Sequence, residues 1–330
     1  MSTRRYHDKV SADLTEGVQK FHDGLVPRVG GVALICGVMS FQFWGHGSIL
    51  IQQTFIALIP IFLLGFWEDL FKSVSSSIRL LGSLFSAFLV VKLTGYNLST
   101  SGFFGIDKVI SADFIWILIT VFALAALSNG LNIIDGFNGL AIGSAISMSL
   151  GISILAWTVN DSLVFEMSLV FVAALSGLLI LNFPFGLIFL GDAGAYTCGL
   201  VLGAMGIILV ERNDSVTPLV LLAVFAYPII ELLFSISRKT IRVGHRPDRP
   251  DKVHLHMLVY RSFAKRISTS RLMRNSVTGA IMNLYSFSGL LFISFSANSR
   301  ASALIYFLLS LMVYLCVYRR VSLNRQYKRS

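Results

Sequence analysis

The sequence predicts an all-α fold that crosses a membrane many times, and three observations support this prediction. Of the 330 residues, 55% are hydrophobic and 13% are charged, and the mean hydropathy is +0.75. A soluble domain carries about 25% charged residues, so this chain lacks the polar surface that would cover a soluble globule. The apolar residues form continuous runs rather than alternating patterns, which excludes an outer-membrane β-barrel. A polytopic integral membrane protein remains.

About ten apolar stretches are expected to form transmembrane helices. A helix needs roughly 20 apolar residues to cross about 30 Å of hydrocarbon. The expected helices cover residues 29–45, 48–67, 79–95, 114–128, 139–158, 163–181, 193–210, 217–235, 278–296 and 301–318. They form one membrane domain over residues 29–318, preceded by a polar segment (1–28) and followed by a basic tail (319–330).

The positions of Lys and Arg predict the orientation. With ten helices, both termini lie on one side of the membrane. If that side is the cytoplasm, all but four of the 27 Lys and Arg lie on it, as the positive-inside rule requires. The exceptions are Lys92, Lys108, Arg212 and Arg300. The net charge of +10 thus reflects topology, and the basic cytoplasmic loop (236–277) lacks the interleaved aromatics of a nucleic-acid-binding module.

Acidic side chains gather at the predicted cytoplasmic ends of these helices. A helix cap or a solvated loop explains any one of them, but not their gathering on one side. They are Glu68, Asp69, Asp135, Asp192, Asp248 and Asp251. Carboxylate oxygens suit Mg²⁺, with Mn²⁺ as an alternative, held together with substrate phosphates. The Asp-Gly and Gly-Asp steps let the backbone approach a phosphate closely.

Two histidines complete this cytoplasmic pattern. His254 and His256 lie in the basic loop, close to Arg249, and histidines beside Arg and Lys suit a pyrophosphate. Together with the acids they indicate phosphoryl transfer on an anionic cytoplasmic substrate, where positioning and charge neutralisation supply most of the catalysis. Composition alone favours a transporter equally.

Five short motifs occur in order between His22 and about Arg261. They are His22-Asp-Gly-Leu-Val-Pro-Arg28, Gly65 to Leu70, Asn132-x-x-Asp135-Gly136, Asn182 with Gly191-Asp192, and His254-Leu-His256. In this order and on this side they resemble the polyprenyl-phosphate N-acetylhexosamine-1-phosphate transferase family, which is glycosyltransferase family 4. The family includes the undecaprenyl-phosphate N-acetylglucosamine 1-phosphate transferases and, more distantly, the phospho-N-acetylmuramoyl-pentapeptide transferase.

The resemblance implies a reaction and its partners. Polyprenyl phosphate attacks the β-phosphorus of a UDP-N-acetylhexosamine, a polyprenyl-pyrophosphoryl sugar forms, and UMP leaves. UDP-GlcNAc or a related sugar is the expected donor, and undecaprenyl phosphate is the expected acceptor. This is the first step of a lipid-linked envelope polysaccharide, such as an O-antigen, at the cytoplasmic face of the bacterial inner membrane.

The resemblance also implies roles for individual residues. Asp192 is the expected Mg²⁺ ligand. Expected catalytic residues are Glu68, Asp69, Asn132, Asp135, His254 and His256. Expected substrate-binding residues are His22, Asn138 and Asn182, with Arg249 from the basic loop.

Four positions depart from the family pattern. Glu68 replaces the first of two aspartates, and Asn138 lies where many members carry an aspartate. Asp23 replaces a lysine of the pentapeptide enzyme and Met257 replaces the last histidine, which argues against UDP-MurNAc-pentapeptide as donor. The pentapeptide reaction, a transporter and an impaired relative stay as alternatives. The oligomeric state, a homodimer included, stays open.

Other charged or reactive residues receive structural interpretations. Glu231 lies seven residues before Arg238 on one helix face, so an ion pair between them is expected as readily as a function. Arg79 is expected to anchor a lipid headgroup or to extend towards the membrane surface. Cys36, Cys198 and Cys316 lie in apolar stretches and are expected to be packing residues.

Overall fold

The computed structural model describes residues 12–13, 26–41, 48–110, 112–241, 253–296 and 299–326. Over these residues the fold is almost entirely helical. One short antiparallel pair joins β1 (Ala12–Asp13) to β2 (Val26–Pro27), with Ala12 opposite Pro27 and Asp13 opposite Val26. The expected all-α class is confirmed.

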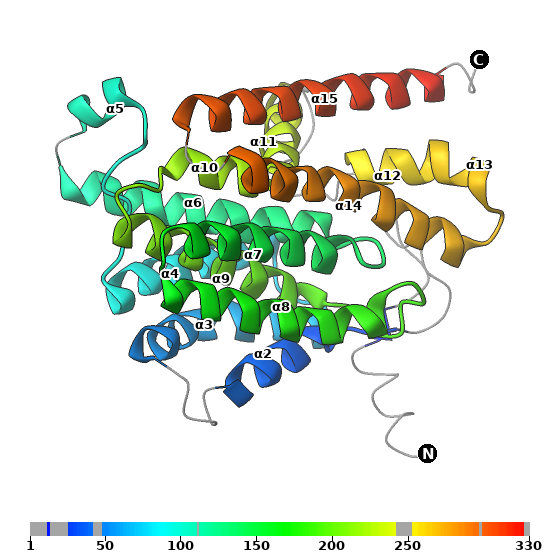
Figure 1. The fold of residues 1–330 in the computed structure, drawn as a ribbon. Helices are drawn as coiled ribbons and strands as arrows, with labels where there is room; N and C mark the ends of the chain where they lie inside the picture. The colour runs from blue at the N-terminus through cyan, green and yellow to red at the C-terminus, as the bar shows by residue number, and fades with distance from the viewer. Residues whose placement is uncertain are drawn as a thin grey trace.

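The helices follow the chain in a simple order (Figure 1). The first seven are α2 (Gly30–Phe41), α3 (Ile49–Phe71), α4 (Ser76–Thr94), α5 (Phe104–Val109), α6 (Asp113–Ile134), α7 (Leu140–Thr158) and α8 (Ser162–Asn182). Next come α9 (Gly191–Arg212), α10 (Pro218–Val224) and α11 (Ala226–Ile241). The last are α12 (Leu255–Val259), the π-helical turn η2 (Tyr260–Ala264), α13 (Lys265–Ile267), α14 (Arg271–Ser296) and α15 (Arg300–Gln326).

Eight of the described helices are long and apolar enough to cross a membrane, and nine are if the bent pair α10–α11 counts as one span. The chain is therefore a multi-pass membrane protein. The count differs from the expected ten at two places. The described part of the stretch 29–45 is the 12-residue α2, and the stretch 217–235 is divided between α10 and α11, whose axes differ by 84°.

Pro228 gives the physical reason for the division between α10 and α11. A proline inside a helix has no N–H to donate, and its ring clashes with the carbonyl four residues earlier. That carbonyl belongs to Val224, the last residue of α10, and α11 begins two residues later at Ala226. The bend lets α11 leave the direction of a single straight span.

Helix α9 forms the centre of the molecule and is enclosed along its whole length. It packs against α2, α3, α4, α6, α7, α8 and α10. Small residues make this close approach feasible, as is usual where membrane helices touch. At Gly199 a Cβ atom would collide with the backbone of Ser128 on α6, and the Ser128 hydroxyl donates a hydrogen bond to the carbonyl of Tyr196 at 2.8 Å.

The peripheral helices instead turn large apolar side chains outward. On α3 these include Ile56, Ile59 and Leu63, and α15 has a similar outer face. Cys36 and Cys316 are exposed, whereas Cys198 is buried in the core. Exposed aliphatic and aromatic side chains on a helix bundle are the expected surface against lipid.

The helix directions place the described parts of the sequence motifs at one end of the bundle. Helices α3, α6 and α8 end there, and α4, α7, α9 and α14 begin there. In Figure 1 this end lies at the right with α12 and α13, and α5 lies at the opposite end. Arg28 before α2 and Tyr318 on α15 both contact residues of this end, so the first and last described parts of the membrane domain lie on the same side.

The contact between Gly199 and Ser128 generates a stability prediction. Gly199→Ala forces α6 and α9 apart, and overpacking of this kind costs about 1–3 kcal/mol. We expect a lower melting temperature in detergent. The matched control is Gly177→Ala on α8, where a Cβ meets nothing within 4 Å; helix propensity predicts an unchanged or slightly higher melting temperature. Equal melting temperatures for the two variants would contradict this account of the packing.

Candidate active site

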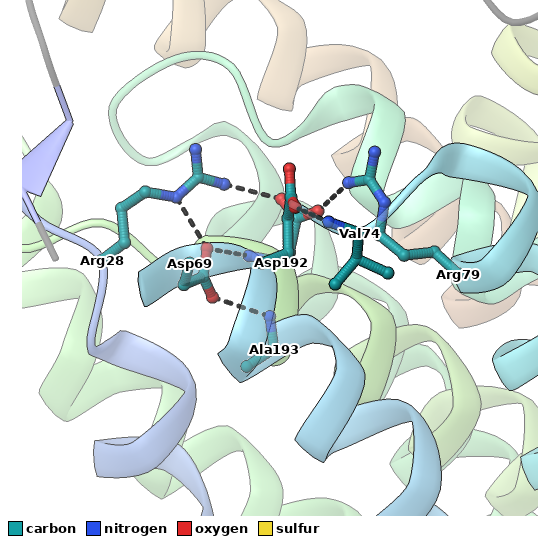
Figure 2. Close-up of polar contacts among 7 residues, drawn as sticks. Arg28, Asp69, Val74, Arg79, Asp192 and Ala193 are labelled. Carbon is teal, nitrogen blue, oxygen red and sulfur yellow. Dashed lines mark hydrogen bonds and ion pairs between the residues drawn. The ribbon is translucent and has the colours of Figure 1, made fainter. Parts of the chain in front are cut away.

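Three carboxylates from distant parts of the sequence meet at the start of α9. Asp69 lies in the last turn of α3, Asp135 follows the last residue of α6, and Asp192 lies in the first turn of α9. The sequence predicted that all three would lie on the same side of the membrane. The structure adds that Asp69 and Asp192 lie together with Arg28 and Arg79 (Figure 2). Asp135 is close enough to interact with the charges of Asp69, Asp192 and Arg28.

Asp69 is buried completely and its carboxylate is saturated with hydrogen bonds. One oxygen accepts from Arg28 Nε at 2.8 Å and from the backbone N–H of Asp192 at 2.9 Å. The other oxygen accepts from the backbone N–H of Ala193 at 3.0 Å. These two N–H groups lack partners within α9 because they belong to its first turn. Asp69 therefore caps α9 from the neighbouring helix and favourably places its charge at the helix N-terminus.

Asp192 lies between two arginines. Arg28 Nη2 donates to one carboxylate oxygen at 2.7 Å, and Arg79 Nη1 donates to the other. Gly191 makes this placement feasible, because its φ of +76° disfavours side chains and a Cβ there would lie 2.6 Å from an oxygen of Asp69. Arg79 thus pairs with an acid of the site, whereas the sequence predicted a lipid contact for it.

Glu68 lies beside this network and holds the turn that carries Arg79. Its carboxylate accepts a hydrogen bond from the backbone N–H of Val74 at 2.8 Å. That contact fixes the turn between α3 and α4, where Lys72 is in the left-handed conformation with φ of 52°. The glutamate that replaces the first aspartate of the motif is therefore long enough to stabilise this turn.

Asp135 is the third carboxylate, and its surroundings disfavour a negative charge. It is half-buried and accepts a hydrogen bond from the backbone N–H of Gly191. Removal from water, together with the negative charges of Asp192 and Asp69, raises the pKa of Asp135 to about 7, although Arg28 opposes this shift. Asn132 is half-buried one turn earlier on α6. A cation near Asp135 would relieve the unfavourable charge.

Asn138 and Asn182 make hydrogen bonds inside the protein. Asn182 Oδ1 accepts from the backbone N–H of Gly139 at 2.6 Å, and its Nδ2 donates to the carbonyl of Ile188 at 2.7 Å. Asn138 Nδ2 donates to the carbonyl of Pro184 at 2.9 Å. Both side chains are buried, so in this structure they tie the α6–α7 loop to the α8–α9 loop. Their predicted contact with substrate stays a prediction.

The two histidines of the motif lie next to the same loop. Their rings stack in parallel, with centroids 5.4 Å apart and planes at 6°. His256 is buried completely, and its Nε2 has no hydrogen-bond partner among the residues that the structure describes. That nitrogen lies 3.9 Å from the position a Cβ would occupy on Gly136, and the His256 ring packs edge-on against Phe137. The His-x-His motif and the Asp135-Gly136 loop are therefore neighbours.

Burial controls the protonation of His256. Removal from water lowers its pKa to about 3, and His254 adds to this effect while Glu231 opposes it. The ring is therefore neutral at physiological pH. Its Nδ1 lies 3.3 Å from the hydroxyl of Tyr227, which holds the ring in place.

Two other predictions from the sequence concern the ion pair between Glu231 and Arg238 and the substrate contacts of His22 and Arg249. Glu231 does not depend on Arg238 for a partner: its carboxylate contacts His254 Nδ1 at 2.8 Å, whereas Arg238 Nη1 donates to the carbonyl of Val253 and to the Tyr318 hydroxyl. His22 and Arg249 lie outside the described residues.

Sequence reasoning gave no catalytic role to Arg28, Arg79 or Glu231. A usable signal was present for all three. Each is a charged residue at the end of an apolar stretch or within it, where a charge needs an opposite partner, and the predicted acids and histidines were the available partners.

Whether these residues fit a metal ion depends on how the ion would be held. Among the described residues, no group of three or more His, Cys, Asp or Glu side chains is placed to enclose one. Mg²⁺ is commonly bound by one or two carboxylates together with substrate phosphates. Asp192 and Asp135 offer hard oxygen donors of this kind, so the site fits an ion shared with a substrate rather than one held by protein alone.

Comparison with known proteins agrees with this geometry. The model of glycosyl transferase family 4 matches residues 51–210. A probable undecaprenyl-phosphate N-acetylglucosaminyl 1-phosphate transferase of Bacillus subtilis is 26% identical over 260 residues, which is 77% of this chain and 71% of the relative. Undecaprenyl-phosphate alpha-N-acetylglucosaminyl 1-phosphate transferases are similar too. That of Thermotoga maritima is 28% identical over 75% of this chain and 72% of its own length. The transferase of Escherichia coli K12 is 26% identical over 78% of this chain and 72% of its own length. The expected resemblance to this family is confirmed.

The buried neutral state of His256 generates a prediction about pH. Between about pH 6.5 and pH 3 the unfolded ring binds a proton and the native ring does not, so the unfolded state gains protons and stability falls as pH falls. In His256→Gln this contribution is absent. We therefore expect the melting temperature of the parent to fall more than that of the variant between about pH 7 and pH 5. Parallel pH dependences would refute the buried neutral ring.

Proposed function

We propose that this chain transfers N-acetylhexosamine 1-phosphate from a UDP-sugar to polyprenyl phosphate and releases UMP. UDP-GlcNAc is the favoured donor and undecaprenyl phosphate the favoured acceptor, because the similar proteins carry these groups in their names. One observation supports the chemistry most strongly: Asp69, Asp135 and Asp192 meet Arg28 and Arg79 at the end of the bundle that also holds the His-x-His motif.

The two arginines suit the phosphates of both substrates. A guanidinium presents several N–H groups in a plane and pairs well with phosphate oxygens. Arg28 and Arg79 are each partly exposed, at 24% and 17% of the side chain, so a phosphate can reach them while they stay in contact with Asp192. They would neutralise charge that develops on the transferred phosphoryl group.

The carboxylates have different tasks in this proposal. Asp69 accepts three hydrogen bonds from Arg28 and from the start of α9, so its task is to position these two parts of the site. The attacking group is a phosphate oxygen that is largely ionised at neutral pH, because the second pKa of a phosphate monoester is about 6. The reaction therefore needs orientation more than a strong base.

A divalent cation belongs to this proposal as a partner of the substrate. When bound, Mg²⁺ supplies positive charge to the pyrophosphate of the donor. Asp192 and Asp135 are the residues that would hold it. Arg28 and Arg79, which face Asp192 here, would then share the phosphate oxygens with the ion.

The lipid acceptor fits the position of the site in the bundle. Asp69 lies in the last turn of α3, and Trp67 and Phe71 on the same turns are exposed towards the outside of the bundle. Aromatic side chains are typical of the membrane–water interface. A polyprenyl chain can therefore remain in the bilayer while its phosphate reaches the arginines.

The location in the cell follows from the same proposal. We place the site on the cytoplasmic face of the bacterial inner membrane, since the UDP-sugar is a cytoplasmic substrate and the described basic residues Arg238 and Arg274 lie near the His-x-His motif at this end. Among the described residues, the charged side chains of the site gather at one end of the bundle. This arrangement favours a transferase over a transporter, which needs polar groups near the bilayer midplane.

The activity prediction uses the purified protein in detergent with undecaprenyl phosphate and Mg²⁺. We expect UMP release with UDP-GlcNAc or another UDP-N-acetylhexosamine, and loss of that release when EDTA is added. Asp192→Asn is expected to lower kcat by at least about 100-fold with an unchanged melting temperature within a few degrees. Gly177→Ala is the matched control and keeps full activity. Full activity of Asp192→Asn would remove the central assignment.

The orientation is tested separately with reporters fused after Ser330. We expect a fluorescent protein at that position to fluoresce and an alkaline phosphatase to be inactive, because the cytoplasm supports the first and not the second. The reverse result would place the basic end of the bundle outside the cell.

A further inference from the structure

Asp69, Asp135, Asp192, Arg28 and Arg79 form what we call the carboxylate–arginine network. Glu231 is a buried acid outside this network. It lies on α11, one turn after Tyr227, and its side chain is completely buried. Its carboxylate contacts His254 Nδ1 at 2.8 Å, and the backbone N–H of Leu255 donates to the same oxygen at 3.4 Å. A buried carboxylate is costly unless it is paired and hydrogen-bonded. The contact with His254 therefore accounts for an acid inside an apolar helix.

This contact determines which nitrogen of His254 carries hydrogen. An ionised carboxylate only accepts hydrogen bonds, so Nδ1 of His254 is the donor. The other ring nitrogen, Nε2, is then left for a ligand. Orientation of a histidine by a carboxylate on its far nitrogen is a general way to fix both the tautomer and the direction of the ring.

The second histidine is held by the same helix. Tyr227 and Glu231 are four residues apart on α11, so they lie on one face of it. Tyr227 contacts His256 Nδ1, and Glu231 contacts His254 Nδ1. The two rings stack in parallel, and His256 Nε2 lies beside Gly136. One face of α11 thus contacts Nδ1 of both rings, while Nε2 of His256 lies on the side of the Asp135-Gly136 loop.

We propose that Glu231 is a positioning residue for the phosphosugar transfer, which it serves by holding His254 with Nε2 directed towards the substrate phosphates. The inference rests on the proposed function. The bend between α10 and α11 places this face of α11 beside α12, whose first residues carry the histidines. Glu231 itself touches no substrate, because its side chain is completely buried.

The test is a double-mutant cycle on UMP release, with Glu231→Gln, His254→Ala and the double variant. Glutamine keeps the shape of the side chain and removes its charge. We expect Glu231→Gln to lower kcat about 10–100-fold with KM for the UDP-sugar within about twofold of the parent. The double variant is expected to be no slower than His254→Ala alone, because both changes remove the same contribution.

A matched control separates this role from general stability. Asp161 is also a buried carboxylate, caps α8, and is held by Arg212 and Asn213 at the opposite end of the bundle. Asp161→Asn and Glu231→Gln should both lower the melting temperature, and only Glu231→Gln should lower kcat.

Three results would overturn the proposal. The first is a kcat of Glu231→Gln within twofold of the parent. The second is a loss of kcat in the double variant that equals the product of the two single losses. The third is a loss of kcat in Asp161→Asn as large as that in Glu231→Gln. With an active parent, each of these leaves the proposed function standing. A parent protein that releases no UMP from any UDP-N-acetylhexosamine would overturn the proposed function, and the role of Glu231 with it.

Discussion

The carboxylate of Asp69 joins the parts of the carboxylate–arginine network, because it binds both Arg28 and the start of α9. It accepts the two free N–H groups at the start of α9 and the Nε of Arg28. A buried carboxylate needs both a cation and donors to offset its lost hydration, and this arrangement supplies both. The left-handed turn at Gly191, and with it the position of Asp192, depends on the same group because Asp69 lies directly against that turn.

Such a network also requires that the start of α9 stays where Asp69 can reach it. Helix α9 is enclosed along its length by neighbours that approach closely at its glycines. At its far end Arg212 pairs with Asp161, which caps α8. The helix is therefore held at both ends and along its sides, so the network is carried by the most enclosed of the described membrane-spanning helices.

The fold class and much of the site could be predicted from the sequence, and the predictions that failed did so for physical reasons. Hydropathy identifies long apolar runs, so α8 and α9 were predicted to within two residues at each end, whereas α6 continues six residues beyond its expected end. It does not register a proline that divides a run, which is why α10 and α11 were predicted as one span. Asp69, Asp135 and Asp192 were found because acids at helix ends are rare. Arg28 and Arg79 were given no role in the site: a charge at the end of an apolar stretch signals that a partner is needed, but not which distant acid supplies it.

The break at Phe225 also has an evolutionary consequence. Asp69, Arg79, Asp135 and Asp192 all lie in the segment that matches the family model, whereas Glu231, His254 and His256 follow the break on a later segment. The two halves of the site touch through the Asp135-Gly136 loop but come from different segments of the chain. Substitutions after the break can therefore alter the histidine side of the site while the three acids and Arg79 stay unchanged, so the two sides can vary separately in evolution.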